Sequence, residues 1–166
     1  MRIQTALADT STPVSLTTLG APVGHDFDSL VSSGTGTSTA NTPPGWGFVE
    51  LAGATSNGSN TTYTAGTGSG NAGDTYSFGI AGAHPVTDRA LGQLRSGAVT
   101  TVIGASFTNN TGSTITSLAI SYAGEQWRIG NTSTARDDRM DFQYSTNATG
   151  LNTGTWTDVN TLDFTN

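Results

Sequence analysis

The sequence has no cysteine and no lysine, only two glutamates and two methionines, and no long apolar run. Without cysteine, neither a disulfide framework nor a thiolate metal site can form. The scarcity of lysine, glutamate and methionine, which favour helices, argues against a helical domain. No apolar run approaches the roughly 20 residues of a membrane-spanning helix, so we expect no membrane insertion.

Positive charge is also scarce, since six arginines face twelve acidic residues and the formal net charge is −6. Proteins that bind nucleic acid neutralise its phosphates with a basic stripe, which this sequence lacks, so we expect no nucleic-acid partner. The start, "MRIQTALADTSTPVS", has no apolar stretch of signal-peptide length. We expect either that export information lies elsewhere or that the chain is an internal piece of a longer protein.

What the sequence does contain is 31 threonines, 17 serines, 11 asparagines and 22 glycines, about half of the chain. Threonine favours strands, whereas glycine, asparagine and serine favour turns. A chain of 166 residues normally forms one domain. The composition therefore predicts a single all-β domain.

Short strand-like runs separated by turn residues fill the chain. We predict a polar lead-in over 1–13 and one β-sandwich domain over 14–166. The predicted strands are 14–20, 45–51, 60–66, 73–80, 90–94, 98–109, 114–130, 138–146 and 156–164, and the predicted surface loops are 31–45 and 66–73. Nine short strands with turn signals between them are typical of a sandwich or barrel.

The run 114–130 contains a change of phase. Its first half places Leu118, Ile120 and Tyr122 on one face, but Trp127 follows one step out of phase. A β-bulge at Gly124 would absorb one residue and return Trp127 to the core face. Without the bulge, the tryptophan ring would face solvent.

Several stretches resemble a module of large secreted or surface bacterial proteins, where it often stands beside lamin-tail, Calx-beta or extracellular endonuclease/phosphatase domains. They are "FDSL" (27–30), "PPGWGF" (43–48), "NTTYTAGTGSGNAGDTYSFG" (60–79), "RALGQLRSG" (89–97), "IGASFTNNTGSTITSLAISYAGEQWRIGN" (103–131) and "DRMDFQYSTNATGLNTGTWTDVNTLDFT" (138–165). The resemblance implies a jelly-roll-like antiparallel β-sandwich that is secreted and accessory to other domains, and it implies no reaction.

The similar modules continue past "LDFT" through further strands. We therefore expect the last strand or two of the sandwich to be missing from this chain, leaving an unpaired edge and an uncovered apolar strip. Another protein chain can fill such an edge by strand addition.

Catalytic residues are hard to find in this sequence. A nucleophilic triad needs a base, but His25 and His84 stand in no recognisable motif. Glu50 and Glu125 are the only glutamates and would be the pair for glycoside hydrolysis. The alternative is two solvent-facing carboxylates, and we predict no enzymatic activity.

Calcium is the metal that the sequence suits best, because it takes carboxylate and carbonyl oxygens from loops. Three groups of aspartates qualify: Asp26 with Asp28, Asp74, and Asp137 with Asp138 and Asp141. We predict Asp28 and Asp74 as calcium ligands. The alternative is that these residues only stabilise turns.

Carbohydrate binding needs an exposed aromatic face with polar groups beside it. Trp46 follows a loop, and Trp127 has Glu125 and Arg128 beside it. We predict these four residues as a glycan-binding site, with core packing of the tryptophans as the alternative. The sequence thus predicts a non-catalytic extracellular or cell-surface binding or adhesion module for a polysaccharide or other glycan. Its alternative is a structural, self-assembling domain that pairs with another chain through an edge strand.

Overall fold

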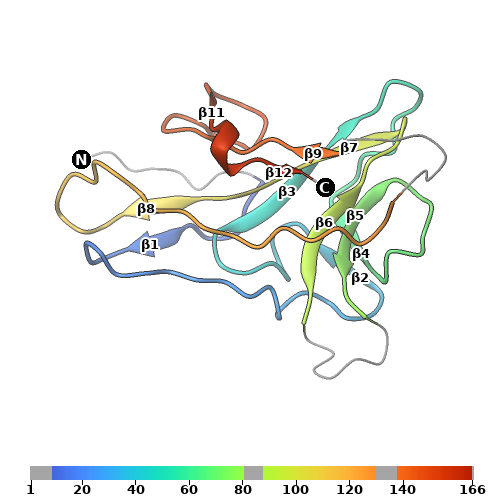
Figure 1. Cartoon of the computed structure of the whole chain (residues 1–166), viewed down its shortest axis with the longest axis horizontal. Coiled ribbons are helices and arrows are strands. Elements are labelled where there is room, and N and C mark those ends of the chain that lie inside the picture. Colours follow the sequence, from blue (N-terminus) through green and yellow to red (C-terminus); the bar gives the residue numbers. More distant parts are fainter. Residues whose placement is uncertain (1–8, 81–87, 130–137, 166) are drawn as a thin grey trace.

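The computed structural model describes residues 9–80, 88–129 and 138–165. Strands supply nearly all of the regular structure (Figure 1). They are β1 (Val14–Leu16), β2 (Thr35–Thr37), β3 (Trp46–Ala52), β4 (Thr62–Gly66), β5 (Asp74–Phe78), β6 (Ala90–Leu94), β7 (Val99–Ala105), β8 (Phe107–Asn109), β9 (Arg139–Met140), β10 (Gln143–Tyr144), β11 (Thr157–Asp158) and β12 (Phe164–Thr165), with one 3-10 turn, η1 (Asn160–Leu162).

The centre of the molecule is a sandwich of two sheets. One is the antiparallel pair β3–β7, and the other has the strand order β2-β4-β5-β6. Side chains alternate along each strand, so that Phe48 points inward from β3 and meets Tyr63 of β4, with ring centroids 6.1 Å apart. Leu30 completes the buried cluster. The all-β sandwich expected from the sequence is therefore confirmed.

Most predicted strands of this centre are present. β6 begins and ends where the sequence predicted, and β3, β4 and β5 lie within two residues of their predicted bounds. The run 98–109 divides into β7 and β8 because the backbone of Ser106 turns away to bond with Gly45 and Val14.

The predicted loop 31–45 contains an edge strand, β2, which pairs with β4. Its middle residue, Gly36, lies against the ring of Tyr63, where a Cβ atom would come within 2.3 Å of the ring. The prediction of a loop was wrong here because the lack of a side chain lets β2 approach that ring.

Residues at both ends of the chain pack beside this centre. In the polar lead-in, Thr10 forms a bridge with Gly47 of β3. β1 pairs in parallel with β8. Residues 138–165 fold back on themselves through two short ladders, β9–β12 and β10–β11.

The predicted strand over 114–130 is wrong for all of its described residues. Residues 114–129 run without a turn or bend across the molecule, from β8 toward the four-stranded sheet (Figure 1). No main-chain group of this segment pairs with a main-chain group of another described residue. The predicted bulge at Gly124 does not exist, because there is no ladder to interrupt; Gly124 instead lies against the ring of Phe164.

Candidate functional site

Trp127 stacks on the four-stranded sheet. Its ring lies 5.9 Å from that of Phe78, with an angle of 11° between the planes. The indole Nε1 donates a hydrogen bond of 2.7 Å to Oε2 of Glu125. Arg128 donates to the carbonyl oxygen of Gly70. Glu125 and Trp127 therefore contact one another, whereas Arg128 contacts the loop after β4, and Phe78 lies beneath the indole, which the sequence did not predict.

The loop that receives this cluster joins β4 to β5. These strands are parallel neighbours, and their connection is only residues 67–73, whereas parallel crossovers usually need a dozen or more. Gly68 makes the short path possible through its φ of +80°. A Cβ atom at Gly68 would lie 2.4 Å from the carbonyl oxygen of Trp127. A glycine is therefore required where the loop and Trp127 approach one another.

The cluster offers a half-covered aromatic surface with polar side chains beside it. Trp127 and Arg128 are half-buried, while Glu125 and Gln126 are exposed. The indole Nε1 is already satisfied by Glu125. Chemically, this arrangement suits stacking against an apolar face, with the carboxylate and amide available to hydroxyl groups.

Trp46 lies apart from the Trp127 cluster. Its Nε1 donates to Nδ1 of His25 at 2.8 Å, and its ring meets that of Phe27 edge-on at 4.8 Å. No described contact joins it to Trp127, so the four predicted glycan-binding residues do not form one site. His84 and Asp137 lie outside the described residues.

Asp28 lies in an exposed acidic turn. Its backbone N–H donates to Oδ1 of Asp26 at 3.1 Å. The pKa of Asp28 is raised, first by partial loss of water contact and then by the negative charges of Asp26 and Asp88. Among the residues that the structure describes, no group of three or more histidine, aspartate or glutamate side chains is arranged to hold a metal ion.

Glu50 is the buried carboxylate of the sandwich centre, with 6% of its surface exposed. Its Oε1 accepts from the backbone N–H of Thr75 at 3.0 Å and from the Thr75 hydroxyl at 2.7 Å. Its Oε2 accepts from the N–H of Asn60 at 2.8 Å. The sequence interpretation of Glu50 as solvent-facing was wrong, although its spacing of two from Phe48 already indicated an inward position.

Asp74, the second predicted calcium ligand, meets Glu50 rather than Asp28. Its Oδ2 accepts from the Thr64 hydroxyl at 3.2 Å, and its Oδ1 is buried without a partner. Burial raises the pKa of Glu50, and contact with Asp74 raises it further, while hydrogen bonds from Thr75 and Asn60 oppose the rise. A proton on Glu50 would give Asp74 a donor. No described hydrogen bond joins Glu50 to Glu125.

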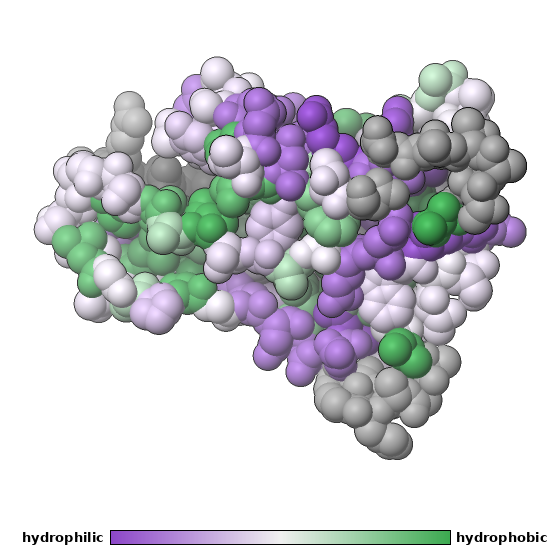
Figure 2. Space-filling view, viewed as in Figure 1, coloured by the Kyte–Doolittle hydropathy of each residue, from purple (hydrophilic) through white to green (hydrophobic). Residues whose placement is uncertain are grey.

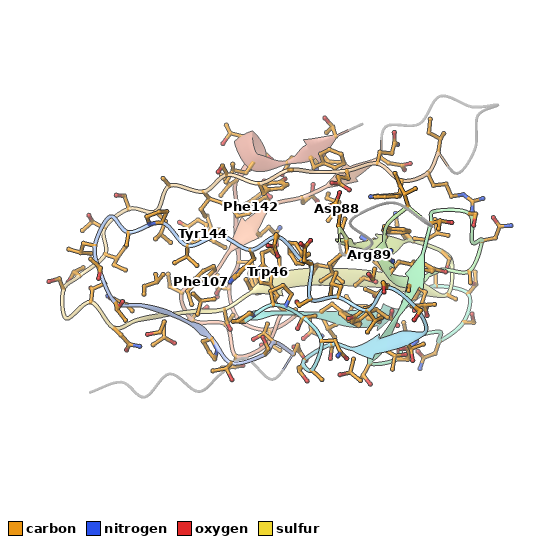
Figure 3. All side chains as sticks on the ribbon, turned by 90° about the horizontal axis from the view of Figure 1, so that it is seen from below. Trp46, Asp88, Arg89, Phe107, Phe142 and Tyr144 are labelled. Carbon is orange, nitrogen blue, oxygen red and sulfur yellow. The ribbon has the colours of Figure 1, made fainter. Side chains whose placement is uncertain are left out.

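The remaining feature is an uncovered apolar surface. Hydrophobic side chains gather over the end of the molecule that holds β1 and β8 (Figure 2), and the labelled Phe107, Phe142 and Tyr144 lie in the same half of the molecule (Figure 3). The exposed large apolar residues of 107–144 are Phe107, Leu118, Ile120, Tyr122, Ile129, Met140 and Tyr144.

Side-chain contacts alone hold 114–129 at this surface. Tyr122 stacks on Phe142, with centroids 6.1 Å apart, and its hydroxyl donates to the carbonyl oxygen of Leu162. At the far end, Trp127 rests on Phe78. The described contacts of this segment lie at Tyr122 and Gly124 and at Trp127 and Arg128, while the side chains of Leu118 and Ile120 remain exposed.

Comparison with protein-family models, curated proteins and solved structures finds no match to this chain. Within the described residues, no helix has the length and apolar character to cross a membrane.

Proposed function

We propose that this chain is a non-catalytic, extracellular binding module of a secreted bacterial protein, and that it accepts a β-strand from another polypeptide along residues 114–129. The jelly-roll form of its sandwich belongs to the same proposal. Secretion and bacterial origin are supported by the composition and the family resemblance. The observation that carries strand acceptance is that residues 114–129 run without a turn or bend and that no main-chain hydrogen bond joins them to another described residue.

The chemistry of this segment suits strand addition. An unpaired strand presents rows of N–H and C=O groups, and an added strand satisfies them while its side chains cover alternate positions. Leu118 is 64% exposed and Ile120 is 45% exposed. An incoming strand would remove this apolar surface from water, which stabilises the complex by about 25 cal/mol for each Å² buried.

Hydrogen exchange with a strand-like probe tests the proposal. The probe is a ten-residue peptide of alternating threonine and valine, and its control is the same peptide with every amide nitrogen methylated. In the monomeric chain we expect the amides of 114–129 to exchange fast. The probe should slow them at least about tenfold and leave β3 unchanged, whereas the methylated peptide should do neither.

Two results would contradict strand acceptance. One is exchange of 114–129 in the free monomer that is as slow as in β3. The other is a probe that protects no amide of this segment.

Glycan binding is the second candidate, and the Trp127 cluster favours it. A half-exposed indole beside an exposed amide and an exposed carboxylate is a common way to hold a sugar ring. Calcium belongs to this candidate as an ion that Asp28 or Asp74 would bind. Affinity electrophoresis through gels of soluble polysaccharides, with and without calcium, tests it. We expect retardation that is lost in Trp127→Ala and kept in Trp156→Ala; no retardation in any gel would reject it.

A further inference from the structure

The partner strand can be named from the sequence of the segment itself. Building on the strand acceptance proposed above, we propose that a second copy of this chain supplies it, with residues 114–124 of the two copies paired antiparallel about Ala119. Such a pair has twofold symmetry, so the same surface serves both copies and the assembly closes as a dimer.

The order of residues around Ala119 is self-complementary. With the two Ala119 residues opposite one another, Leu118 faces Ile120 of the second copy, and Ile120 faces its Leu118. One step further out, Ser117 faces Ser121. Large apolar side chains therefore meet on one face and hydroxyls on the other, and cross-strand pairs of like character stabilise sheets.

The charge pattern of the sequence permits pairing along this segment. The chain carries a net charge of −6, so two copies repel one another in general, yet residues 107–124 contain neither a charged residue nor a proline. Charges and prolines are the devices by which natural edge strands avoid pairing. β6, by contrast, lies between Arg89 and Arg95, and β2 has only three residues.

Because the chain has no cysteine, a single introduced cysteine can report which residues lie opposite one another in the dimer. Opposed residues of an antiparallel pair have Cα atoms roughly 4.5–5.5 Å apart, which a disulfide spans. Under mild oxidation, Ala119→Cys should therefore cross-link to a dimer. Ser117→Cys alone should not, because its two copies lie about 14 Å apart. A mixture of Ser117→Cys and Ser121→Cys should form the heterodimer, and sedimentation should show a dimer of the wild-type chain without any cross-link.

A variant at the symmetry axis tests the interaction without a cross-link. Ala119→Glu places two carboxylates opposite one another, and we expect its dimer dissociation constant to rise at least about tenfold at low salt and less at high salt. Reduced Ala119→Cys is the matched control and should dimerise like the wild type.

Three other outcomes would overturn the antiparallel register, the second copy as partner, or strand acceptance as well. Cross-linking of Ser117→Cys alone would overturn the antiparallel register. A chain that stays monomeric at all concentrations, while the threonine–valine probe still protects 114–129, would overturn the second copy and leave strand acceptance standing. Monomers with no protection would overturn both.

Discussion

The strand β3 and the segment 114–122 both carry large apolar residues two positions apart, but only β3 buries such a residue completely. In β3, Phe48 alternates with the half-buried Val49 and is 2% exposed, because β7 pairs with its main chain and β4 covers its ring. In the other segment Leu118 alternates in the same way and is 64% exposed. Alternation therefore indicates that a stretch of chain needs a covering layer; it does not indicate which polypeptide supplies that layer.

The largest expected effect separates these two positions. Phe48→Ala should lower the free energy of unfolding by about 3–5 kcal/mol, because it leaves a cavity in the buried cluster. Leu118→Ala should change it by less than about 0.5 kcal/mol. Denaturant titration at low protein concentration measures both. Equal losses would mean that Leu118 is packed as tightly as Phe48, and the contrast between the regions would disappear.

The two glutamates give a second comparison between the buried centre and the exposed segment. Glu50→Gln should cost about 1–3 kcal/mol at pH 7, because the amide group cannot accept both sets of N–H donors and one buried donor loses its partner. Glu125→Gln, on the exposed segment, should cost less than about 0.5 kcal/mol. The same titration checks this pair of variants. A harmless Glu50→Gln would show that these hydrogen bonds contribute nothing to stability.

Two glycines test how residues 114–129 are anchored. Gly68 and Gly112 have positive φ values of 80° and 74°, but only Gly68 would bring a Cβ atom against Trp127. Gly112→Ala should cost about 1–2 kcal/mol from the backbone conformation alone. Gly68→Ala should cost more and shift the fluorescence of Trp127. Equal costs and an unchanged emission would mean that the loop and Trp127 do not depend on each other.

These pairs also show what the sequence could predict. The bounds of β6 follow from its turn-forming neighbours, and such local signals located most strands of the sandwich. β2 was not predicted because its pairing depends on the space that Gly36 leaves for the ring of Tyr63. These two residues are far apart in the sequence.

The site was predictable only in part, for the same reason. The adjacency of Glu125, Trp127 and Arg128 is visible in the sequence, but the stacking of Trp127 on Phe78 is a long-range contact. The meeting of Glu50 with Asp74 required knowing how β3 lies over β5. The local sequence shows whether a residue is apolar, polar or charged. The residue that it contacts depends on how distant strands are arranged in the fold.

The smallest effect is a dependence of stability on pH that arises from this carboxyl pair. The pKa of Glu50 is raised in the folded protein above its ordinary value of 4.5. A raised pKa means that the folded state binds the proton more tightly than the unfolded state. The stability from this group is therefore fully present below pH 4.5 and is lost as pH rises through the folded pKa.

Comparison with Glu50→Gln isolates this contribution, because the other carboxylates titrate in both proteins. The difference in unfolding free energy between wild type and Glu50→Gln should be larger at pH 4 than at pH 7. A difference that shrinks as the pH falls would mean that the hydrogen bonds from Thr75 and Asn60 outweigh burial and lower the pKa of Glu50. Glu50 would then be a carboxylate stabilised by its donors, and the unpartnered oxygen of Asp74 would gain nothing from a proton on its neighbour.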